Sequence, residues 1–443
     1  MGARTSPAER LSNAMGLYQS PISPGRSWYE DSCGDRPQYD ALDGSHSCSV
    51  VVIGGGFCGL SAALTLAESG CDVVVLEQHR CGDGASGRNG GQMGSGQRAG
   101  ILDLESELGF ERAKALWDLA EHAKQNLHNT AQQHGFDYDY QAGQLSPMHK
   151  RRYEREAREE IDFLNQRLGY ESMSWLDKSE METALGSKHY FGGSRDTGTG
   201  HIHPMKYLIG LAQAAARAGA GIFEQTPMTH LTRQGQKWGV TTPHGDVTAD
   251  TVLLALNGYH NDIHETLART VLPIQSFIGA TVPLPDDTPV LPGKEAVDDS
   301  RFVVRYFRKS KDNRLLFGGR EAYGKSAPGD IERTIRKQIA EIYPALSDVE
   351  ITHAWGGNVA ITMPRMPMVR ELEPGLWTAG GFSGHGVMLS NYTGRLLAEH
   401  LTGKSDMIKL LQDLKIPSFP GGTMLRHPLK VLALTWYAML DRI

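Results

Sequence analysis

The glycine-rich segment GGGFCG, residues 54–59, constrains the fold more than any other part of this chain. An apolar run, SVVVI, precedes it, and small and apolar residues follow it as far as Gly70. A second apolar run, VVVLE, then ends at Glu77. A strand, a glycine turn, a helix and a second strand in this order predict one βαβ unit over residues 49–77. The expected fold class is therefore α/β.

The spacing inside this segment matches GxGxxG, the pattern of a dinucleotide-binding turn. Gly54 permits the tight turn, Gly56 leaves room for a pyrophosphate, and Gly59 lets the helix pack closely on the strand. The N-terminus of the helix offers free N–H groups and a partial positive charge to the phosphates. Glu77 stands 18 residues after Gly59, where its carboxylate can accept hydrogen bonds from both ribose hydroxyls and disfavours NADP. A glycine turn in an α/β protein without a nucleotide is the alternative.

Composition narrows the class of protein further. The formal net charge is -6 over 443 residues, and no block rich in Lys and Arg stands apart from acidic neighbours, which argues against nucleic acid as a partner. The five cysteines lie in the first fifth of the chain without CxxC spacing, so neither a zinc site nor a disulfide framework is expected. The N-terminus lacks the apolar core of a secretory signal, and no run of about 18 apolar residues predicts a membrane span. We therefore expect a cytoplasmic protein.

The rest of the chain alternates between helical and strand-like patterns. Residues 1–44 are rich in Gly, Pro, Ser and Asp without periodicity, which predicts an extended arm that lies on the body. Further along, the patterns predict helices over residues 101–190, a helix from Pro204 to Gly219, a β-rich stretch over 271–320, a helix over 327–343, and a strand, glycine turn and helix over 377–403.

A second glycine-rich loop, GDGASGRNGGQ at residues 82–92, directly follows the second strand. It is too dense in glycine to be a packed element, and such a loop can run its backbone along an extended ligand. Together with GGGFCGLSAALTLAESG, VVVLE, GHIHP, DNRLLFGGR, GFSGHGV and FPGGTMLR, it resembles the D-amino-acid-oxidase-like superfamily of flavoproteins, in the branch that contains γ-glutamylputrescine oxidase. The resemblance covers the chain from about residue 27 onward.

This resemblance implies two interleaved domains. A discontinuous Rossmann-type FAD-binding domain is expected from residues 46–100, 192–265 and 350–405, and a β-rich substrate domain from 101–191 and 266–349. An N-terminal arm, 1–45, and a C-terminal extension, 406–443, complete the chain. The substrate is expected over the flavin, where the two domains meet.

The resemblance also implies which residues bind FAD. In this family the loop around Ser86 to Gly91 passes beside the flavin, and the backbone at Met228 faces the adenine. The turn GGFSGHG, residues 380–386, lies at the flavin ring, where N–H groups can stabilise the negative charge of reduced flavin. The candidate cofactor-binding residues are Gly54, Gly56, Phe57, Gly59, Glu77, Gln78, Ala85, Ser86, Arg88, Asn89, Gly90, Gly91, Met228, Gly258, Gly381, Gly384, His385 and Gly386.

Three histidines have alternative roles. His385 is a candidate for a proton or a charge beside the flavin, with a structural, hydrogen-bonded histidine as the alternative. His201 and His203 lack a third metal ligand nearby, so we expect them to order the turn before Pro204 and expect no metal. The family's covalent attachment residues are absent, since residues 82–92 contain no histidine and the stretch from Trp355 to Pro364 contains no cysteine. Non-covalent FAD is therefore expected.

The activity implied by the resemblance is that of an FAD-dependent amine oxidase. It would oxidise the primary amine of γ-glutamylputrescine, or of a similar γ-glutamylated polyamine, to an aldehyde, with O2 as the oxidant and with release of ammonia and hydrogen peroxide. Arg305, Arg308 and Arg320 are candidates for the cation that holds the distant substrate carboxylate, with solvated surface arginines as the alternative.

Three other activities stay open. One is a sarcosine- or amino-acid-type flavin oxidase. Another is a quinone-linked flavin dehydrogenase, for which the apolar-faced C-terminal segment HPLKVLALTWYAMLDRI would make a peripheral membrane contact. The third is a non-catalytic protein that senses a dinucleotide.

Overall fold

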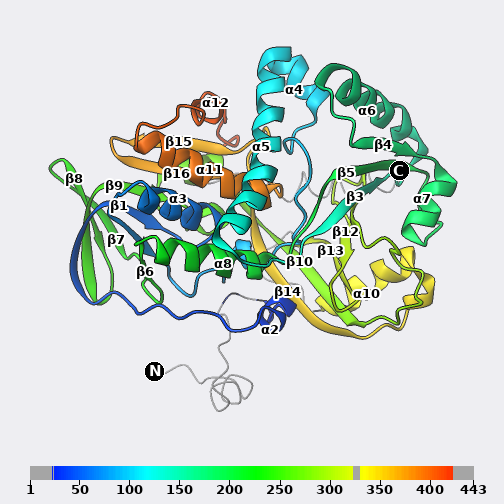
Figure 1. Cartoon of the computed structure of the whole chain (residues 1–443), viewed down its shortest axis with the longest axis horizontal. Coiled ribbons are helices and arrows are strands. Elements are labelled where there is room, and N and C mark those ends of the chain that lie inside the picture. Colours follow the sequence, from blue (N-terminus) through cyan, green and yellow to red (C-terminus); the bar gives the residue numbers. More distant parts are fainter. Residues whose placement is uncertain (1–21, 23, 323–329, 423–443) are drawn as a thin grey trace.

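The computed structural model describes residue 22, residues 24–322 and residues 330–422, without the side chains of residues 320–322. Two eight-stranded sheets stand side by side in these ranges, with a long helix, α5 (Phe110–His134), above the junction between them (Figure 1). The C-terminal segment with the apolar face lies outside the described residues. None of the described helices is both long and apolar enough to cross a membrane.

The first sheet is the α/β part of the molecule. Its strand order is β15-β16-β9-β1-β2-β6, with β8 paired to β9 and β7 paired to β8. Its strands are β1 (Gly44–Ile53), β2 (Val73–Leu76), β6 (Gly221–Phe223), β7 (His230–Gln234), β8 (Lys237–Thr241), β9 (Gly245–Leu254), β15 (Met368–Glu373) and β16 (Leu376–Gly380). Strands β16, β9, β1, β2 and β6 run parallel, as connections through helices require. The predicted βαβ unit is confirmed as β1, α3 (Phe57–Glu68) and β2.

One layer of helices covers this sheet. Helix α3 lies between α8 (Pro204–Arg217) and α11 (Gly386–Leu401) (Figure 1). Close approach of α3 and α11 depends on Gly394, because a Cβ there would lie 2.1 Å from the carbonyl oxygen of Cys58. The strands beneath are apolar and fully buried in β2 and in the last four residues of β1, as expected for a parallel sheet covered by helices.

The second sheet is the predicted β-rich part and has the order β14-β10-β13-β12-β11-β3-β5-β4. Its strands are β3 (Gln141–Pro147), β4 (Met173–Leu176), β5 (Gly193–His201), β10 (Leu272–Pro283), β11 (Ala296–Asp298), β12 (Tyr306–Lys309), β13 (Arg314–Ala322) and β14 (Ile351–Ile361). Its associated helices include α6 (Glu154–Leu168), α7 (Lys178–Leu185) and α10 (Ile331–Ile342). The remaining helices are α2 (Trp28–Ser32), α4 (Ile101–Leu108), α9 (Glu265–Thr270) and α12 (Lys409–Gln412).

Two strands belong to a different sheet from the one that the sequence predicts. The expected segments 192–265 and 350–405 group β5 and β14 with the nucleotide-binding sheet, whereas both strands pair in the second sheet. Strand β5 pairs with β3 and β4, and β14 pairs with β10. Long-range strand pairing decides this membership, and no local pattern reports it.

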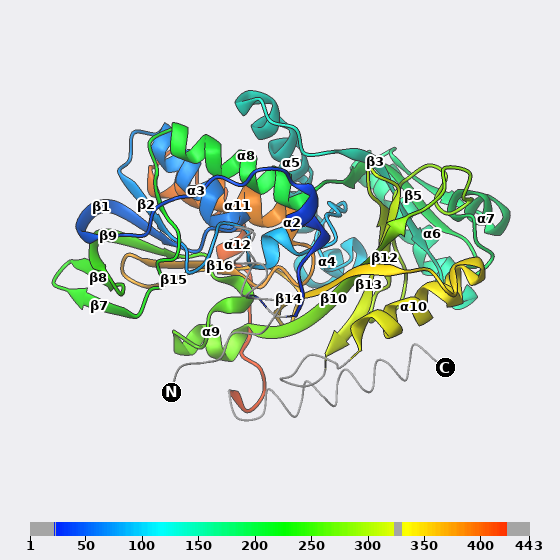
Figure 2. The same ribbon diagram turned by 90° about the horizontal axis from the view of Figure 1, so that it is seen from below.

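The N-terminal arm is more ordered than the predicted extended segment. It contains α2, whose Ser27 N-cap accepts a hydrogen bond from the backbone N–H of Glu30. Trp28 and Tyr29 are buried, and the Tyr29 ring lies edge-on to Trp355 of β14. From α2 the arm, in blue, runs along the outside of the molecule to β1 (Figures 1 and 2). Burial of two aromatic side chains anchors the arm.

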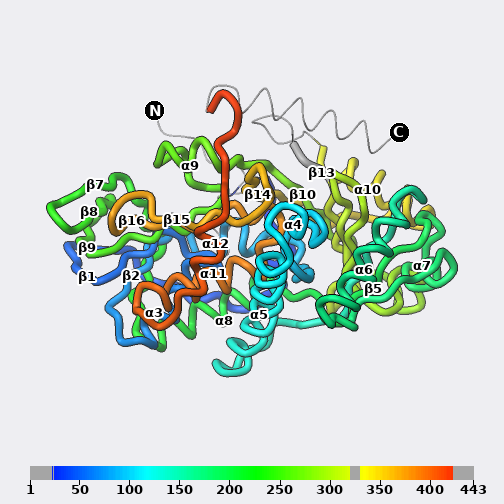
Figure 3. The backbone as a smooth tube through the Cα atoms, turned by 90° about the horizontal axis from the view of Figure 1, so that it is seen from above, coloured from blue at the N-terminus to red at the C-terminus, as the bar shows by residue number. Residues whose placement is uncertain are grey.

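The last described residues cross to the side of the molecule where α9 lies. They run from α12 to α9, in red in Figure 3. There the backbone N–H of Phe419 donates to the carbonyl oxygen of Arg269 at 2.8 Å.

Candidate cofactor and substrate site

A cavity of about 1560 Å³ lies where the two sheets meet. Its wall includes the residues that directly follow β1, β2 and β9: Gly54, Glu77 and Ala255. The carboxyl ends of parallel strands are the usual ligand site of an α/β sheet. The volume exceeds the range of about 300–1,000 Å³ that is typical of a pocket for one small ligand, so an extended cofactor and a second molecule fit together.

The GxGxxG turn has the shape that a pyrophosphate requires. Gly54 has a φ of 114°, which side chains rarely adopt, and its N–H donates to the Leu76 carbonyl at 2.9 Å. A Cβ at Gly59 would lie 2.0 Å from the Gly54 carbonyl oxygen, and one at Gly56 would lie 2.9 Å from Ser86 Oγ. The α3 N-cap is Gly56, without a side-chain cap. The Phe57 N–H donates to Ser86 Oγ at 2.9 Å, and the Cys58 and Gly59 N–H groups of the first turn remain available to an anion. These residues fit the phosphates of FAD.

Glu77 has the position and the free acceptor capacity to bind a ribose. Its Oε2 accepts the Gly55 N–H at 2.7 Å and its Oε1 accepts the His79 N–H at 2.9 Å, so each oxygen keeps acceptor capacity. Burial raises the pKa of Glu77 to about 7, against the opposing effect of these two hydrogen bonds. The Thr226 N–H donates to the Glu77 carbonyl at 2.8 Å, which brings Met228 to the same part of the wall.

Arg88 lies in the 82–92 loop and on the cavity wall, but its charged group is bound by other residues of the protein. Its guanidinium donates to the carbonyl oxygens of Pro24, Gly25 and Gly356 and forms an ion pair with Glu30 at 3.2 Å. Both charged side chains are almost fully buried. Arg88 therefore fastens this loop to the N-terminal arm and to β14.

The turn at residues 380–386 points the N-terminus of α11 at the cavity. Gly384 and Gly386 line the wall, and His385 is the N-cap residue but makes no side-chain cap. The Ser383 N–H donates to the Ala360 carbonyl at 2.8 Å, which ties this turn to β14. The uncapped helix end offers N–H donors to an electron-rich ring.

The surroundings of His385 favour the neutral ring over the charged ring, two forms that the sequence left open. Burial, together with the nearby positive charge of Arg98, lowers the pKa of His385 to about 4. The ring is therefore neutral near pH 7, and its Nε2 lies 3.1 Å from the Gly96 carbonyl oxygen, to which it donates. The alternative reading, a structural hydrogen-bonded histidine, agrees with this geometry.

Most of the sequence-predicted cofactor residues meet at this one cavity. Those on its wall are Gly54, Gly56, Phe57, Glu77, Gln78, Ala85, Ser86, Arg88, Asn89, Gly90, Gly91, Met228, Gly384, His385 and Gly386. Gly59, Gly258 and Gly381 stand behind the wall. Gly258 accepts a hydrogen bond from Asn358 Nδ2 at 3.3 Å, and the Gly381 N–H donates to Asn257 Oδ1 at 3.0 Å, so both glycines support neighbouring parts of the wall.

The three arginines predicted for the substrate are not among the wall residues. Arg305 forms an ion pair with Glu341, and the side chain of Arg320 lies outside the described residues. Arg308 is only 4% exposed, so the alternative of a solvated surface arginine is wrong for it. Its guanidinium donates to the carbonyl oxygens of Gly90 and Ile202 and to the Tyr29 hydroxyl.

Sequence reasoning missed many polar residues on the cavity wall, among them Arg98, Gln144 and Asp298. Arg98 follows the glycine-rich loop and makes no hydrogen bond or ion pair with the described residues. Gln144 and Asp298 come from β3 and β11, strands that pair in parallel although about 150 residues separate them. No local motif signals such a pair.

The two histidines of GHIHP have protein partners. His203 Nδ1 accepts the Lys206 N–H at 3.2 Å and so caps α8, which confirms the predicted role at this helix start. His201 Nε2 lies 3.0 Å from the Lys294 carbonyl oxygen. Among the residues that the structure describes, no group of three or more His, Cys, Asp and Glu is placed to hold a metal ion.

Comparisons with known proteins agree with this site. Residues 49–400 match the family model described as FAD dependent oxidoreductase, DAO. The chain is 54% identical to "Probable oxidoreductase OrdL" of Rhizobium meliloti over 425 residues, which cover 96% of this chain and 99% of that protein. It is 33% identical to "Gamma-glutamylputrescine oxidoreductase" of Escherichia coli over 420 residues, which cover 94% and 98%.

The fold has solved counterparts as well. The crystal structure of glycine oxidase from Geobacillus kaustophilus superimposes with a TM-score of 0.70 at 21% identity, over 84% of this chain and all of that one. At this identity the likeness shows the fold alone. The family match sets aside the non-catalytic dinucleotide sensor. The glycine turns, the buried Glu77 and the match over most of the chain lead to one conclusion: this protein belongs to the DAO family of FAD-dependent oxidoreductases, enzymes that act on amine or amino-acid donors.

Proposed function

We propose that this protein is an FAD-dependent oxidase of primary amines whose substrate is γ-glutamylputrescine or a similar γ-glutamylated polyamine. The observation that carries the proposal is Arg98, a cation on the cavity wall without an acidic partner among the described residues. A carboxylate on the substrate would provide that partner. The whole-length similarity to the Escherichia coli protein named for γ-glutamylputrescine supports the choice of amine.

The chain's own residues position the amine and stabilise charge. FAD, once bound, supplies the two-electron acceptor for oxidation of the amine carbon. A neutral amine needs little from the protein beyond orientation and exclusion of water. The N–H groups of Gly384 and Gly386, at the uncapped start of α11, are placed to stabilise negative charge on the cofactor.

Arg98 replaces the three arginines that the sequence suggested for the substrate carboxylate. It lies close to the α11 turn, because the carbonyl oxygen of Gly96, two residues before it, accepts a hydrogen bond from His385 Nε2 at 3.1 Å. It therefore stands on the part of the wall where a substrate over the flavin would end. A guanidinium held free of protein acids can form two parallel hydrogen bonds with a carboxylate.

The substrate assignment predicts a clear preference. γ-Glutamylputrescine should reduce the bound flavin without oxygen and, in air, consume O2 and water to give an aldehyde, ammonia and hydrogen peroxide. Free putrescine lacks the carboxylate, and its kcat/KM should be about 10- to 100-fold lower, as expected for the loss of a charge-assisted interaction. Anaerobic stopped-flow absorbance and peroxide release measure the two half-reactions.

Two outcomes of the same assay would redirect the assignment. Turnover of sarcosine or an α-amino acid, with none of γ-glutamylated amines, would favour the amino-acid-type oxidase. Flavin reduction by γ-glutamylputrescine without peroxide in air, but with reduction of an added quinone, would favour the dehydrogenase.

We also propose that FAD is held without a covalent bond. Cys58 is the cysteine on the described cavity wall, and burial raises its pKa to about 12, so the reactive thiolate is absent near pH 7. Precipitation of the purified protein with acid should release the yellow chromophore into the supernatant, where its absorbance can be measured. Colour that stays with the pellet would contradict this prediction.

A further inference from the structure

Asp298 presents a carboxylate oxygen without a partner to the cavity. It ends β11 in the second sheet and lies on the cavity wall. Its Oδ1 accepts hydrogen bonds from Gln144 Nε2 at 2.9 Å and from Ser146 Oγ at 2.7 Å. Its Oδ2 accepts none from the described residues. The two donors orient the carboxylate and leave one oxygen for a ligand.

The side-chain amide of the neighbouring Gln144 also lacks a hydrogen-bond donor for its oxygen in the described part of the chain. Gln144 is 9% exposed, and its Oε1 is buried without a hydrogen-bond partner among the described residues. An unsatisfied buried acceptor is costly, and so is a buried carboxylate without a cation. Accordingly, desolvation by burial raises the pKa of Asp298. The cluster therefore needs N–H donors and positive charge, and an ammonium group carries both.

Arg98 stands near this cluster without joining it. Its charge lowers the pKa of Asp298, which partly offsets the effect of burial, so the two groups interact through space. They nevertheless form no ion pair or hydrogen bond, although both line the same cavity. Opposite charges held apart across a cavity suit a ligand that carries both charges at one end.

We infer that Asp298 binds a second ammonium group of the substrate, beside the carboxylate that Arg98 binds. The ligand class is a diamine or polyamine with an α-amino-acid head at the end that is not oxidised. The γ-glutamyl group has such a head, since its α-carbon carries an ammonium and a carboxylate. This inference rests on the proposed function for the identity of the oxidised amine.

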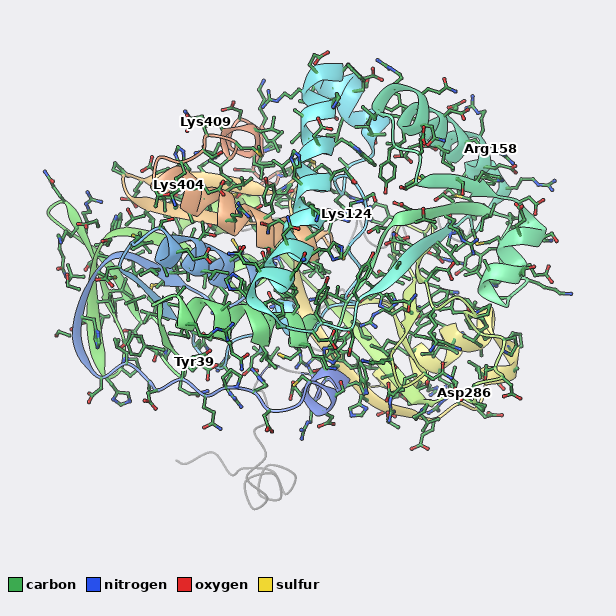
Figure 4. The ribbon with its side chains drawn as sticks, viewed as in Figure 1. Tyr39, Lys124, Arg158, Asp286, Lys404 and Lys409 are labelled. Atoms are coloured by element: carbon green, nitrogen blue, oxygen red, sulfur yellow. The ribbon has the colours of Figure 1, made fainter. Side chains whose placement is uncertain are left out.

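A comparison of three substrates on three proteins tests the inference. The substrates are γ-glutamylputrescine, glutarylputrescine, which has the same chain and carboxylate but no α-ammonium, and putrescine. The proteins are the FAD-loaded wild type, Asp298→Asn and the control Asp286→Asn. Asp286 is an exposed acid that follows β10 and is labelled at the outer edge in Figure 4.

Removal of the α-ammonium from the substrate and removal of the Asp298 carboxylate from the protein are expected to have non-additive effects on kcat/KM. The wild type should prefer γ-glutamylputrescine to glutarylputrescine by about 10- to 100-fold in kcat/KM, mainly through KM. Asp298→Asn should lose a similar factor on γ-glutamylputrescine and stay within about threefold of the wild type on the other two substrates. Asp286→Asn should behave as the wild type with all three.

Other patterns would overturn the inference. An equal loss of kcat on all three substrates would place Asp298 at the reacting amine, where it would accept a proton. Equal kcat/KM of the wild type for the γ-glutamyl and glutaryl substrates would show that no group of the protein recognises the α-ammonium. That last result needs no variant, so it decides the question even if Asp298→Asn does not fold.

A binding measurement separates this inference from the proposed function. N-butyl-γ-glutamine keeps the amino-acid head but has no primary amine to oxidise at its other end. Calorimetric titration should show binding to the wild type and about 10- to 100-fold weaker binding to Asp298→Asn. This result would support the inference even if γ-glutamylputrescine were not oxidised, which would defeat the proposed function alone. Equal binding to both proteins would defeat the inference alone.

Discussion

Replacing Glu77 by alanine is expected to weaken FAD binding by about 2–4 kcal/mol, because two charge-assisted hydrogen bonds to the ribose are lost and water restores them only in part. The loss also removes the acceptor of the Gly55 and His79 N–H groups, which lie at the same turn. Titration of the apoprotein with FAD, followed by flavin fluorescence, measures the change. Glu159→Ala, on the exposed face of α6, is the matched control. Unchanged affinity in the Glu77 variant would remove this residue from the site.

The same carboxylate predicts a dependence of FAD affinity on pH. In the apoprotein, burial raises the pKa of Glu77 from 4.5 to about 7. Ribose hydroxyls donate to the charged form, so FAD binding lowers this pKa and releases a proton. Affinity should therefore fall as the pH drops below about 7, by up to about tenfold for each pH unit, and should level off above it. Glu77→Gln should flatten the profile.

The stability of the apoprotein should fall as the pH rises, whereas the affinity for FAD should increase. Because the folded-state pKa of Glu77 lies above the unfolded value, the group's stabilising contribution is complete below about pH 4.5 and is lost as the pH rises through about 7. An FAD affinity of the wild type that stays constant between pH 6 and 8 would contradict the first prediction. A urea midpoint of the apoprotein that does not fall between pH 5 and 8 would contradict the second.

Replacing Arg88 by methionine is expected to destabilise the apoprotein by about 3–5 kcal/mol, as is typical when one member of a buried ion pair is removed. Buried Glu30 would lose its closer cation and keep the partly exposed Arg26, whose Nε lies 3.9 Å from its Oε2. The carbonyl oxygens of Gly25 and Gly356 would lose the guanidinium as a donor. The shift of the urea unfolding midpoint, combined with the slope, measures the effect. FAD affinity should fall as well, because the 82–92 loop loses the side-chain bonds from Arg88 and is held to β14 by the Trp355 Nε1 bond to the residue-88 carbonyl oxygen at 3.0 Å.

A double variant identifies the cause. Glu30→Gln combined with Arg88→Met should be less destabilised than the sum of the single variants, because no uncompensated charge remains. Arg155→Met is a suitable control, since Arg155 is an exposed arginine of α6 that pairs with the exposed Glu159. A loss below about 1 kcal/mol in Arg88→Met would show that other contacts hold the arm.

The parts of the fold that the sequence predicts are those set by local interactions. The βαβ unit follows from a glycine turn between two apolar runs, and α8 begins at Pro204 because proline suits the first helical position and His203 caps it. Strands β5 and β14 are different, because their patterns are equally compatible with either sheet. Only their partners, β3 and β10, decide the outcome.

The same distinction between local and long-range interactions applies to the candidate site. The residues that we propose for the phosphates and the ribose lie within residues 54–77, so one motif predicts them. Gln144 and Asp298 meet only through the pairing of β3 with β11, which no nearby residue reports. For Arg308 the sequence suggested too much exposure, since an arginine in a strand of alternating polar and apolar residues is usually solvated. Here carbonyl oxygens from two distant segments surround it, and burial becomes favourable.

The attachment of the 82–92 loop to β14 has a consequence for how this protein is made. On a ribosome, Arg88 emerges 268 residues before Gly356, whose carbonyl oxygen it binds. At roughly 5–20 residues per second, that interval lasts about 15–50 s. Throughout it, the nascent chain can complete its βαβ unit, but it has neither the carbonyl that fastens Arg88 nor the α11 turn that follows. The adenosine end of the cofactor site can therefore form early in translation, whereas the flavin end can form only when synthesis is nearly finished.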